Sequence, residues 1–275
     1  MNAPIPLVSP ATKDVAIVVP VYNQIAYTLQ CIEGLLSSEA RQAELIVVDN
    51  GSTDGTAEYL RQLAGVRTIR NTQNRGVACA WNQGVNACTT AWVVILNNDT
   101  VLPIGWLLGL LNAAAEYDYD VISPSLREGQ LDYPVESYAE RFVTAMGEVF
   151  RPGVADGACF AVRRRVFDRI GGFDERFRYA QFEDVDFFLR AGQACFQLGI
   201  TGRSFIHHYS SVTQRALQDS GLAGDYEVVN RAYFRQKWDL RQPKRFWLRW
   251  KRKGMEWYWA RRERYRYGYT LKEST

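Results

Sequence analysis

Residues 93–101, which read VVILNNDTV, constrain the fold of this chain more than any other stretch. The uninterrupted apolar run at residues 93–96 predicts a strand that is buried on both faces, as in a parallel sheet covered by helices. The polar residues after it lie where open α/β sheets bind ligands, at the carboxyl end of a strand. The stretch therefore predicts an α/β sheet with a ligand site at one edge.

Two interpretations of Asn97, Asn98, Asp99 and Thr100 remain open on this stretch alone. Asn, Asp and Thr are common turn residues, so NNDT fits a simple strand-to-loop turn. Alternatively, a carboxylate at Asp99 would hold a divalent cation, and the cation would hold a diphosphate. Short motifs are weak evidence, so the rest of the chain decides between the two.

The preceding residues repeat the order of strand, polar edge and helix. Residues 15–22 (VAIVVPVY) predict a buried strand, and residues 25–37 carry apolar residues at helical spacing. Residues 45–48 predict a second strand that ends at Asp49, followed by a helix at residues 56–63. This β-α-β-α order predicts a doubly wound, largely parallel sheet.

The polar groups after the second strand suit a nucleotide. A carboxylate at Asp49 can accept hydrogen bonds from a ribose or a uracil-type imide, and the turn at Asn50-Gly51 offers backbone amides to oxygens. Arg75 beside Gly76 places a cation where a tight backbone can approach a phosphate, although an exposed Arg at a helix start explains it equally well. No GxGxxG follows the first strand and no GK[ST] is present, which excludes the dinucleotide fingerprint and the P-loop.

The second half of the chain offers an acidic cluster. Residues 157–162 predict a strand close to the site, and residues 182–192 a helix that opens with Glu183, Asp184 and Asp186. Acids in a first helical turn often only balance the helix dipole, which explains Glu183 or Asp186 well. Three acids after an aromatic loop also suit a general base, because partly apolar surroundings raise the proton affinity of a carboxylate.

The two histidines of the sequence are adjacent, at His207 and His208. Histidine is a common ligand of divalent metals, but an isolated histidine is more often structural. An imidazole here and the carboxylate of Asp99 could converge on one cation. Both interpretations stay open on the residues alone.

Taken together, these segments resemble the family 2 glycosyltransferases, which have the GT-A fold. VAIVVPVYNQ is similar to the family's first strand, ELIVVDNGSTDGT to its nucleotide-binding strand and turn, and NRGVACAWNQG to the segment before the metal motif. LNNDT resembles the D-x-D position, GGFDERFRYAQFEDVDFFLR the acceptor-side and base segment, and FIHHYSS the late histidine. The resemblance implies an α/β GT-A fold, with a mostly parallel central sheet flanked by helices.

The resemblance also implies roles for individual residues. Asp184 would be the catalytic base, with Gly157 and Glu183 on the acceptor side. Asp99 would bind Mg²⁺ or Mn²⁺, with His207 as the further metal ligand and His208 as the alternative if the register is one off. The nucleotide-sugar pocket would be lined by Pro20, Tyr22, Asn23, Asp49, Asn50, Gly51, Arg75, Gly76, Asn97 and Asn98.

Asn97 departs from the family pattern, because the first acid of D-x-D normally stands there. An amide carbonyl carries no charge and ligates a cation weakly, so metal dependence rests mainly on Asp99. Within the family, the sequence N-N-D-T is similar to the sequence at this position in enzymes that transfer deoxyhexoses such as rhamnose from dTDP donors.

The resemblance implies a metal-dependent inverting glycosyltransferase, that is, a hexosyltransferase. It would move a sugar, with a lean towards a deoxyhexose such as rhamnose from a dTDP- or UDP-activated donor, onto a hydroxyl of a glycan or lipid-linked acceptor in bacterial surface polysaccharide synthesis. The alternative is an inactive nucleotide-sugar-binding or scaffold subunit, for which Asn97 is the best support. A hydrolase would instead need two carboxylates that flank the scissile bond.

Residues 241–269 form a basic and aromatic stretch, in which Phe246, Trp250 and Trp257 fall on one face of a predicted helix. Such segments suit an anionic membrane surface. Docking onto a protein is an alternative, and we expect no nucleic-acid partner although cations with aromatics also suit single strands. We therefore divide the chain into an N-terminal extension (1–14), a GT-A domain (15–240) and a C-terminal tail (241–275).

Composition adds limits on location and partners. The net charge of +3 over 275 residues does not by itself indicate a polyanion-binding protein. Five dispersed cysteines without a CxxC pair favour reduced thiols. The N-terminus lacks the basic start and apolar segment of a signal peptide, and no stretch has the roughly 18 apolar residues that span a bilayer. We expect a cytoplasmic protein, with the inner face of the cytoplasmic membrane as the contact surface of the tail.

Overall fold

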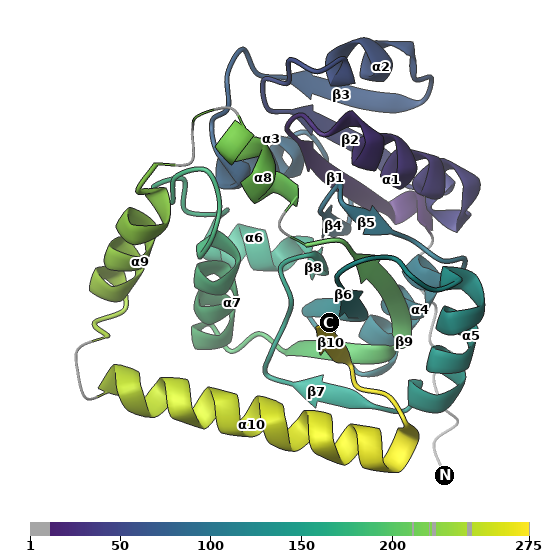
Figure 1. The fold of residues 1–275 in the computed structure, drawn as a ribbon, viewed down its shortest axis with the longest axis vertical. Helices are drawn as coiled ribbons and strands as arrows, with labels where there is room; N and C mark the ends of the chain where they lie inside the picture. The colour runs from purple at the N-terminus through teal and green to yellow at the C-terminus, as the bar shows by residue number, and fades with distance from the viewer. Residues whose placement is uncertain (1–11, 211, 220, 222–223, 241–243, 275) are drawn as a thin grey trace.

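The computed structural model describes residues 12–210, 212–219, 221, 224–240 and 244–274 (Figure 1). Its strands are β1 (Val15–Val21), β2 (Glu44–Asp49), β3 (Val66–Arg70), β4 (Trp92–Leu96), β5 (Thr100–Val101), β6 (Val121–Glu128), β7 (Phe150–Pro152), β8 (Cys159–Arg163), β9 (Leu198–His208) and β10 (Lys272–Ser274). Its α-helices are α1 (Ile25–Ser37), α2 (Thr56–Gln62), α3 (Val77–Asn86), α4 (Trp106–Glu116), α5 (Val135–Met146), α6 (Arg164–Ile170), α7 (Glu183–Gln193), α8 (Val212–Asp219), α9 (Tyr226–Lys237) and α10 (Lys244–Tyr267). Two short 3₁₀ helices lie at Thr12–Asp14 and Glu39–Gln42.

The strands form one sheet with the order β3-β2-β1-β4-β8-β6-β9-β5, and β10 pairs with β6 while β7 pairs with β9. The first four strands are parallel, as the alternation of strands and helices predicts. Beyond β4 the sheet is mixed, because β8 runs antiparallel to both of its neighbours. Parallel pairing returns between β6 and β9 and between β6 and β10, so parallel pairs occur in both halves of the sheet.

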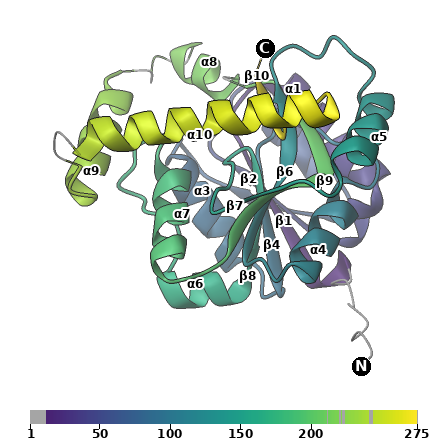
Figure 2. The same ribbon diagram turned by 90° about the horizontal axis from the view of Figure 1, so that it is seen from below.

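Strand β4 is buried on both faces, which confirms the prediction from the apolar run at residues 93–96. Val94 and Leu96 belong to one core cluster, which also contains α1 and α4 residues. Val93 and Ile95 belong to a second cluster with α3 and α7 residues. Figure 2 shows the two groups of helices on opposite sides of the sheet. Alternate residues of one strand thus supply two cores.

A third hydrophobic cluster lies under α5. Strand β6 continues to Glu128, and α5 buries Ala139, Phe142 and Met146. These three residues recur at a spacing of three and four, so they form one helical face. They pack with residues of β9 and with Leu271 just before β10.

Helix α10 lies along the lower edge of the molecule in Figure 1 and leads back to the sheet through β10. The domain boundaries at residues 14 and 240 stay predictions. The end of the C-terminal tail, strand β10, is part of the central sheet. The side chains of Phe246 and Trp250 lie outside the described residues, while Trp257 is 63% exposed. None of the described helices is long and apolar enough to cross a bilayer.

Candidate functional site

The carboxyl ends of β1 and β2 bring the predicted nucleotide residues together, since Val21 and Asp49 are register partners. Asp49 is fully buried, and its Oδ1 accepts the Ser52 backbone N–H at 2.8 Å. Its Oδ2 has no hydrogen bond, although Arg70 Nε lies 3.5 Å away. A buried acceptor without a partner is costly, so Asp49 is set up to receive an N–H or O–H from a ligand.

The loops after β1 and β2 are hydrogen-bonded to each other. The Asn23 backbone N–H donates to Ser52 Oγ at 2.9 Å, and Asn23 Oδ1 accepts the Thr53 N–H at 2.8 Å. Asn23 itself has a left-handed backbone with φ 53°. Pro20 and Tyr22 are half-buried beside this junction. These predicted pocket residues therefore share one pre-formed rim.

Asn50 serves this rim differently from the prediction. Its amide group donates to Asn74 Oδ1 at 3.0 Å and to the Gly76 carbonyl at 3.1 Å. Its Oδ1 accepts from Asn71 Nδ2 and from the Arg75 backbone N–H. The side chain of Asn50 is therefore fully used in holding the loop of residues 71–76, and it is not free to bind a nucleotide.

Two glycines allow close backbone approaches at the same place. Gly51 has φ 87°, and a Cβ there would lie 2.7 Å from the backbone of Gln73. Gly76 has φ 86°, and a Cβ there would lie 3.1 Å from the Tyr179 nitrogen. Both predicted positions thus need glycine for the path of the chain. The side chain of Arg75 is exposed, and its contact with a donor stays a prediction.

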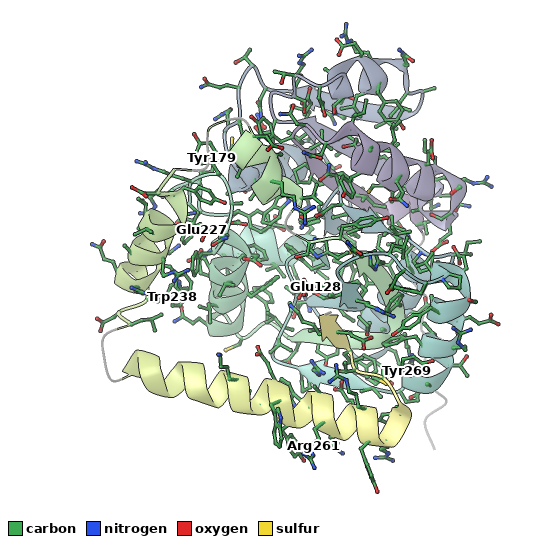
Figure 3. All side chains as sticks on the ribbon, in the orientation of Figure 1. Glu128, Tyr179, Glu227, Trp238, Arg261 and Tyr269 are labelled. Carbon is green, nitrogen blue, oxygen red and sulfur yellow. The ribbon has the colours of Figure 1, made fainter. Side chains whose placement is uncertain are left out.

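A cavity of about 290 Å³ lies next to this rim. It joins five of the predicted residues, namely Asn97, Gly157, Glu183, Asp184 and His208. The full lining is Val77, Trp81, Asn97, Glu128, Asp156, Gly157, Ala158, Gln181, Glu183, Asp184, His208 and Lys272. Figure 3 shows the labelled Glu128 near β10 in the middle of the molecule.

The polar side chains after β4 lie in two different places, the cavity and the contact with α1. Asn97 lines the cavity, whereas Asn98 Nδ2 donates to Thr28 Oγ1 of α1 at 2.9 Å. The amide nitrogen of Asn98 therefore faces α1, and a contact of Asn98 with a donor stays a prediction. Thr100 Oγ1 donates to the Asn97 carbonyl at 2.9 Å, so the stretch is a turn as well as a cavity wall.

His208, and not His207, lies beside Asp99. His208 Nε2 is 3.2 Å from Asp99 Oδ1, and His208 Nδ1 is 3.4 Å from Glu128 Oε1. His207 Nδ1 instead lies 2.9 Å from the Tyr133 hydroxyl. Neighbouring residues on a strand point to opposite faces, so only one of the two histidines can face Asp99. The assignment of His207 is corrected to the register alternative, His208.

Burial alone would lower the pKa of His208, but the carboxylates of Asp99 and Glu128 outweigh it and raise that pKa to about 10. Burial and the neighbouring charge of His208 lower the pKa of His207 to about 4. The two carboxylates therefore favour the charged form of His208, and burial favours the neutral form of His207. An imidazole ligates a cation only in its neutral form, so cation binding at His208 would release a proton.

Helix α7 carries the acids on the opposite wall. Glu183 Oε2 is buried without a hydrogen-bond partner, and burial followed by the charge of Asp184 raises the pKa of Glu183. Burial also raises the pKa of Asp184, and the charge of Asp156 adds to this. Asp184 therefore has the raised proton affinity that a general base needs near neutral pH.

Gly157 has a steric reason to be glycine. A Cβ at this position would lie 2.1 Å from Asp184 Oδ2. The Asp184 carboxylate rests directly on the Gly157 backbone, while its Oδ1 accepts the Val185 N–H at 2.7 Å. The carboxylate is thus held from two sides.

The loop before α7 is strained. Tyr179, Gln181 and Phe182 have φ values of 55°, 79° and 78°, which non-glycine residues rarely adopt. Asn230 of α9, fully buried, holds this backbone: its Oδ1 accepts the Arg178 N–H and its Nδ2 donates to the Arg178 carbonyl, both at 2.8 Å. The carboxylates at the start of α7 therefore depend on α9 for their position.

The sequence also matches the models of two related families. The family described as "Glycosyl transferase family 2" matches residues 16–171, which is more than half of the chain. This chain belongs to glycosyltransferase family 2. A second model, "Glycosyltransferase like family 2", matches residues 139–214.

Curated relatives of this family 2 glycosyltransferase come from several bacteria. Glycosyltransferase GlyG of Streptococcus pneumoniae is 30% identical over 112 residues, which cover 39% of this chain and 37% of GlyG. Pre-mycofactocin glycosyltransferase of Mycobacterium tuberculosis is 29% identical over 196 residues, 66% of this chain and 40% of that protein. The N-acetylglucosaminyl-diphospho-decaprenol L-rhamnosyltransferase of Mycobacterium tuberculosis is 26% identical over 243 residues, 74% of this chain and 79% of the relative. This chain thus spans about two fifths of the length of the first two relatives.

Solved structures of similar shape are glycosyltransferases. Mannosyltransferase PcManGT of Pyrobaculum calidifontis, in complex with GDP-Man and Mn²⁺, aligns with a TM-score of 0.55 at 17% identity over 85% of this chain and 82% of its own. GalNAc-T7 with UDP, GalNAc and Mn²⁺ aligns with a TM-score of 0.57 at 16% identity over 71% of this chain and 43% of its own. At such identities the likeness concerns the fold, which is the GT-A glycosyltransferase fold, as the resemblance implies.

The residues of this family 2 glycosyltransferase partly fit a divalent cation. Asp99 Oδ1 is buried and makes no hydrogen bond, and it faces the His208 imidazole. Carboxylate oxygens suit Mg²⁺, and an added imidazole nitrogen also suits Mn²⁺. Among the described residues, no three His, Cys, Asp or Glu side chains are grouped to hold a metal. Asp99 and His208 would therefore be the described residues that hold such a cation, which would supply positive charge beside a bound anion.

Seven lining residues are absent from the sequence-based prediction, and four of them carry charged or amide side chains, namely Glu128, Asp156, Gln181 and Lys272. Asp156 stands in an Asp-Gly pair directly before a predicted strand, which is a signal that could have been used. Lys272 follows Leu271 at the start of a short strand near the end of the chain, and nothing in that stretch indicates which strand it joins.

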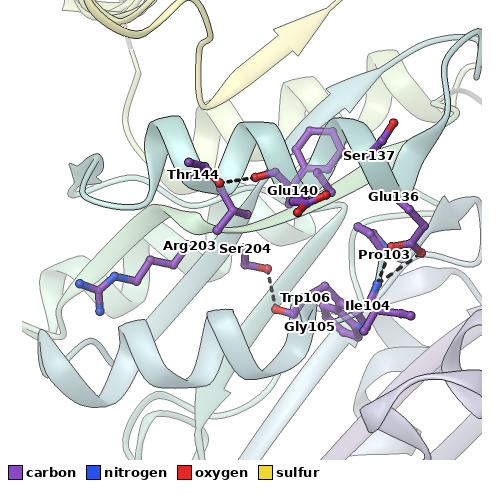
Figure 4. A pocket seen from close by; sticks show the side chains of 13 residues that line it. Pro103, Ile104, Gly105, Trp106, Glu136, Ser137, Glu140, Thr144, Arg203 and Ser204 are labelled. Atoms are coloured by element: carbon purple, nitrogen blue, oxygen red, sulfur yellow. Dashed lines mark hydrogen bonds between the residues drawn. The ribbon is translucent and has the colours of Figure 1, made fainter.

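A larger cavity of about 620 Å³ lies between α4, α5 and β9 (Figure 4). None of the predicted site residues lines it. Its walls are partly tied together, since Ser204 Oγ donates to the Trp106 carbonyl at 2.6 Å (Figure 4). Its two carboxylates, Glu136 and Glu140, belong to α5 and do not stand at strand ends.

Proposed function

We propose that this protein is a metal-dependent inverting glycosyltransferase that moves a sugar from a nucleoside diphosphate onto a hydroxyl of a glycan or lipid-linked acceptor. The observation that carries the proposal is the carboxylate of Asp184, which lines the cavity with a raised pKa. It rests against Gly157, where any larger residue would displace it. A base in such a position acts mainly through positioning and electrostatics.

The proposed reaction is a single displacement. Asp184 takes the proton from the acceptor hydroxyl, and the oxygen attacks the anomeric carbon from the face opposite the diphosphate. As the new glycosidic bond forms, the bond between the anomeric carbon and the diphosphate oxygen breaks, and the nucleoside diphosphate leaves with the electron pair. One carboxylate is sufficient, because no covalent intermediate forms. Asp49 would accept a hydrogen bond from the base or ribose, since its Oδ2 is buried without a hydrogen bond. A divalent cation held by Asp99 and His208 would supply positive charge beside the diphosphate.

For the donor we favour a deoxyhexose such as rhamnose, activated by dTDP or UDP, in bacterial surface polysaccharide synthesis. Two observations support this lean: the NNDT sequence after β4, and the 26% identity to an L-rhamnosyltransferase along most of both chains. The Mn²⁺ in two structural relatives supports a divalent cation, Mg²⁺ or Mn²⁺.

A panel of nucleotides tests the proposal. We expect UDP or dTDP, with Mn²⁺ or Mg²⁺, to raise the melting temperature of the protein, because a ligand that binds only the folded state stabilises it. GDP is the comparison. Sugar nucleotides of the stabilising base then identify the donor in a transfer assay. Failure of every nucleotide to bind, with and without Mn²⁺, would remove the proposed function.

The alternative role as an inactive nucleotide-sugar-binding or scaffold subunit is favoured by Asn97, which replaces the usual acid. It predicts nucleotide binding in the panel without transfer of any sugar. The same panel therefore separates the two functions.

Helix α10 supports a contact with an anionic membrane surface, at the inner face of the cytoplasmic membrane. Tyr265 is 94% exposed, and Trp257 and Tyr258 are more than half exposed. Arg261 stacks on the Trp257 ring at 5.3 Å and points away from the body of the protein (Figure 3). Exposed aromatics among cations suit the interface of an anionic bilayer.

Vesicle sedimentation tests this contact. We expect binding to vesicles that contain phosphatidylglycerol and little binding to pure phosphatidylcholine. Combined replacement of Trp257, Tyr258 and Tyr265 by Ala should abolish it. Val228→Ala, which removes an apolar residue that is 67% exposed on α9, is the matched control. Unchanged binding of the triple variant would exclude α10 as the contact.

A further inference from the structure

Strand β10 presents its residues to two different sides. Leu271, just before the strand, is fully buried in the cluster under α5. Glu273 lies on that side too, because Tyr138 of α5 donates its hydroxyl proton to Glu273 Oε2 at 3.0 Å. Lys272, between them, lines the cavity that contains Asp184. The alternation of a strand thus directs one ammonium group from the C-terminal segment into the site.

The strand is fixed in place by a buried ion pair. Arg151 donates to both oxygens of Glu263, at 2.8 and 2.5 Å, and both side chains are buried. Glu263 Oε2 also accepts the Thr270 hydroxyl and the Leu271 N–H, both at 2.9 Å. A bidentate, hydrogen-bonded pair of this kind defines geometry. Lys272 therefore enters the cavity from a rigid support.

The cavity that Lys272 enters is acidic. Its Nζ lies 2.5 Å from Asp156 Oδ2, and Glu128, Glu183 and Asp184 line the same cavity. Among the described residues that line it, Lys272 and His208 are the basic ones. His208 is already placed between Asp99 and Glu128. Lys272 is therefore the basic residue that is available to balance the acidic side chains around Asp184, the proposed base.

We propose that Lys272 is a positioning residue for sugar transfer, whose ammonium group holds Asp156 and offsets negative charge around Asp184, so that β10 is a working part of the active site. This inference rests on the proposed function, because it takes Asp184 as the base. The groups that face Asp184 are Glu183 beside it on α7, Asp156 before β8, and Lys272 on β10, with Glu128 and His208 on the remaining walls. The charge of Lys272 lowers the pKa of Asp184, against the larger effect of burial.

The test compares Lys272→Met with Lys272→Arg, in the full chain and with the donor found by the nucleotide panel. We expect Lys272→Met to lower kcat by about tenfold or more and to leave the donor KM within about threefold. The acid limb of its pH–rate profile should move to higher pH, because Asp184 loses a neighbouring positive charge. Lys272→Arg should restore most of kcat. Lys253→Met, an exposed lysine of α10, is the matched control and should behave like the native protein.

Two results would overturn the inference. One is an unchanged kcat and pH profile in Lys272→Met. The other is a lower melting temperature in Lys272→Met with kcat and the acid limb unchanged at a temperature where the protein is folded, which would show a structural role only. Failure of the proposed function looks different: the native protein itself would then transfer no sugar from any donor of the panel. Transfer by Asp184→Asn at the native rate would remove only the assignment of Asp184 as the base. An inactive Asp184→Asn together with a fully active Lys272→Met rejects the inference alone.

Discussion

The first turn of α7 faces two ways, and the two sides treat the same kind of residue differently. On the side of α9, Asp186 is fully buried and paired: Arg190 lies at 2.9 Å, Lys237 at 2.6 Å, and the Trp238 indole donates at 3.0 Å. On the side of the cavity, Glu183 and Asp184 form no ion pair with another described residue. Three acids that look equivalent in the sequence are therefore divided by their partners.

The difference separates two uses of a buried carboxylate. One is paired with cations and holds two helices together, and the other is available to take a proton. The buried carboxylate of Asp186, paired with two cations, joins α7 to α9. Burial without an ion-pair partner raises the pKa of Asp184, which can then take a proton. The helix-dipole explanation is thus sufficient for neither residue: Asp186 is part of a structural ion pair, and Asp184 is the candidate base.

The largest expected effect is that of Asp184→Asn. We expect transfer to fall by about 10³-fold, within the range that general bases contribute, while nucleotide affinity stays the same. The free energy of unfolding at neutral pH should stay equal or rise. The sign follows from the raised pKa: ionisation of Asp184 above that pKa costs the folded state free energy, and Asn removes this cost. Initial rates, nucleotide titration and urea unfolding measure the three quantities.

Asp186→Ala should show the opposite pattern. Removal of one partner from a buried ion pair leaves Arg190 and Lys237 with uncompensated charge, so we expect a loss of about 3–5 kcal/mol in the free energy of unfolding. Transfer at low temperature, where the variant is folded, should stay within about tenfold of the native rate. Urea unfolding tests the loss of stability, and initial rates of sugar transfer at about 10–15 °C test the activity. If Asp186→Ala and Asp184→Asn had the same profile, the contrast between the two sides of α7 would be wrong.

A smaller effect is expected from Gly157→Ala. The added Cβ would meet Asp184 Oδ2, which must move aside. Displacement of a catalytic group by about 1 Å can cost on the order of 10²-fold in rate, so we expect a fall of about 10- to 100-fold. The melting temperature should change little, because the displaced atoms are the end of a side chain. Gly192→Ala, at an open position on the same helix as Asp184, controls for the substitution itself.

The smallest effect is the pH dependence of the native protein. Transfer should rise with pH as Asp184 loses its proton, and the midpoint of this rise should lie clearly above 3.8, the ordinary aspartate value. Burial raises the pKa, so the base is protonated, and inactive, over a wider acidic range than an exposed aspartate. A pH–rate profile of kcat measures the midpoint. A midpoint at or below the ordinary value would place the base elsewhere.

The local patterns of the sequence were sufficient for the N-terminal half of the fold. Helix α1 occupies the residues that the apolar spacing predicts, and β4 is buried on both faces as the run at residues 93–96 requires. The resemblance also placed Asn97, Gly157, Glu183 and Asp184, which meet in one cavity. Local periodicity and motif order carry this information because each element there is a simple strand or helix.

The remainder depends on long-range pairing, which local patterns do not encode. Nothing within residues 157–162 tells that β8 runs antiparallel to β4, and nothing near Lys272 tells that β10 joins β6. The choice between His207 and His208 is a question of strand register, and a shift of one residue exchanges the two faces. Asn98 shows the same limit, since only the position of α1 reveals that its amide faces Thr28.

The pairing of β10 with β6 has a consequence for the order of assembly. Proteins fold from the N-terminus during synthesis, so the nucleotide rim at β1 and β2 emerges from the ribosome long before residue 272. The loop that carries the acids cannot settle into its left-handed backbone until Asn230 has been made, and Lys272 arrives later still. The growing chain would therefore form the rim at β1 and β2 first, and it would complete the cavity that contains Asp184 only after Lys272 has been made.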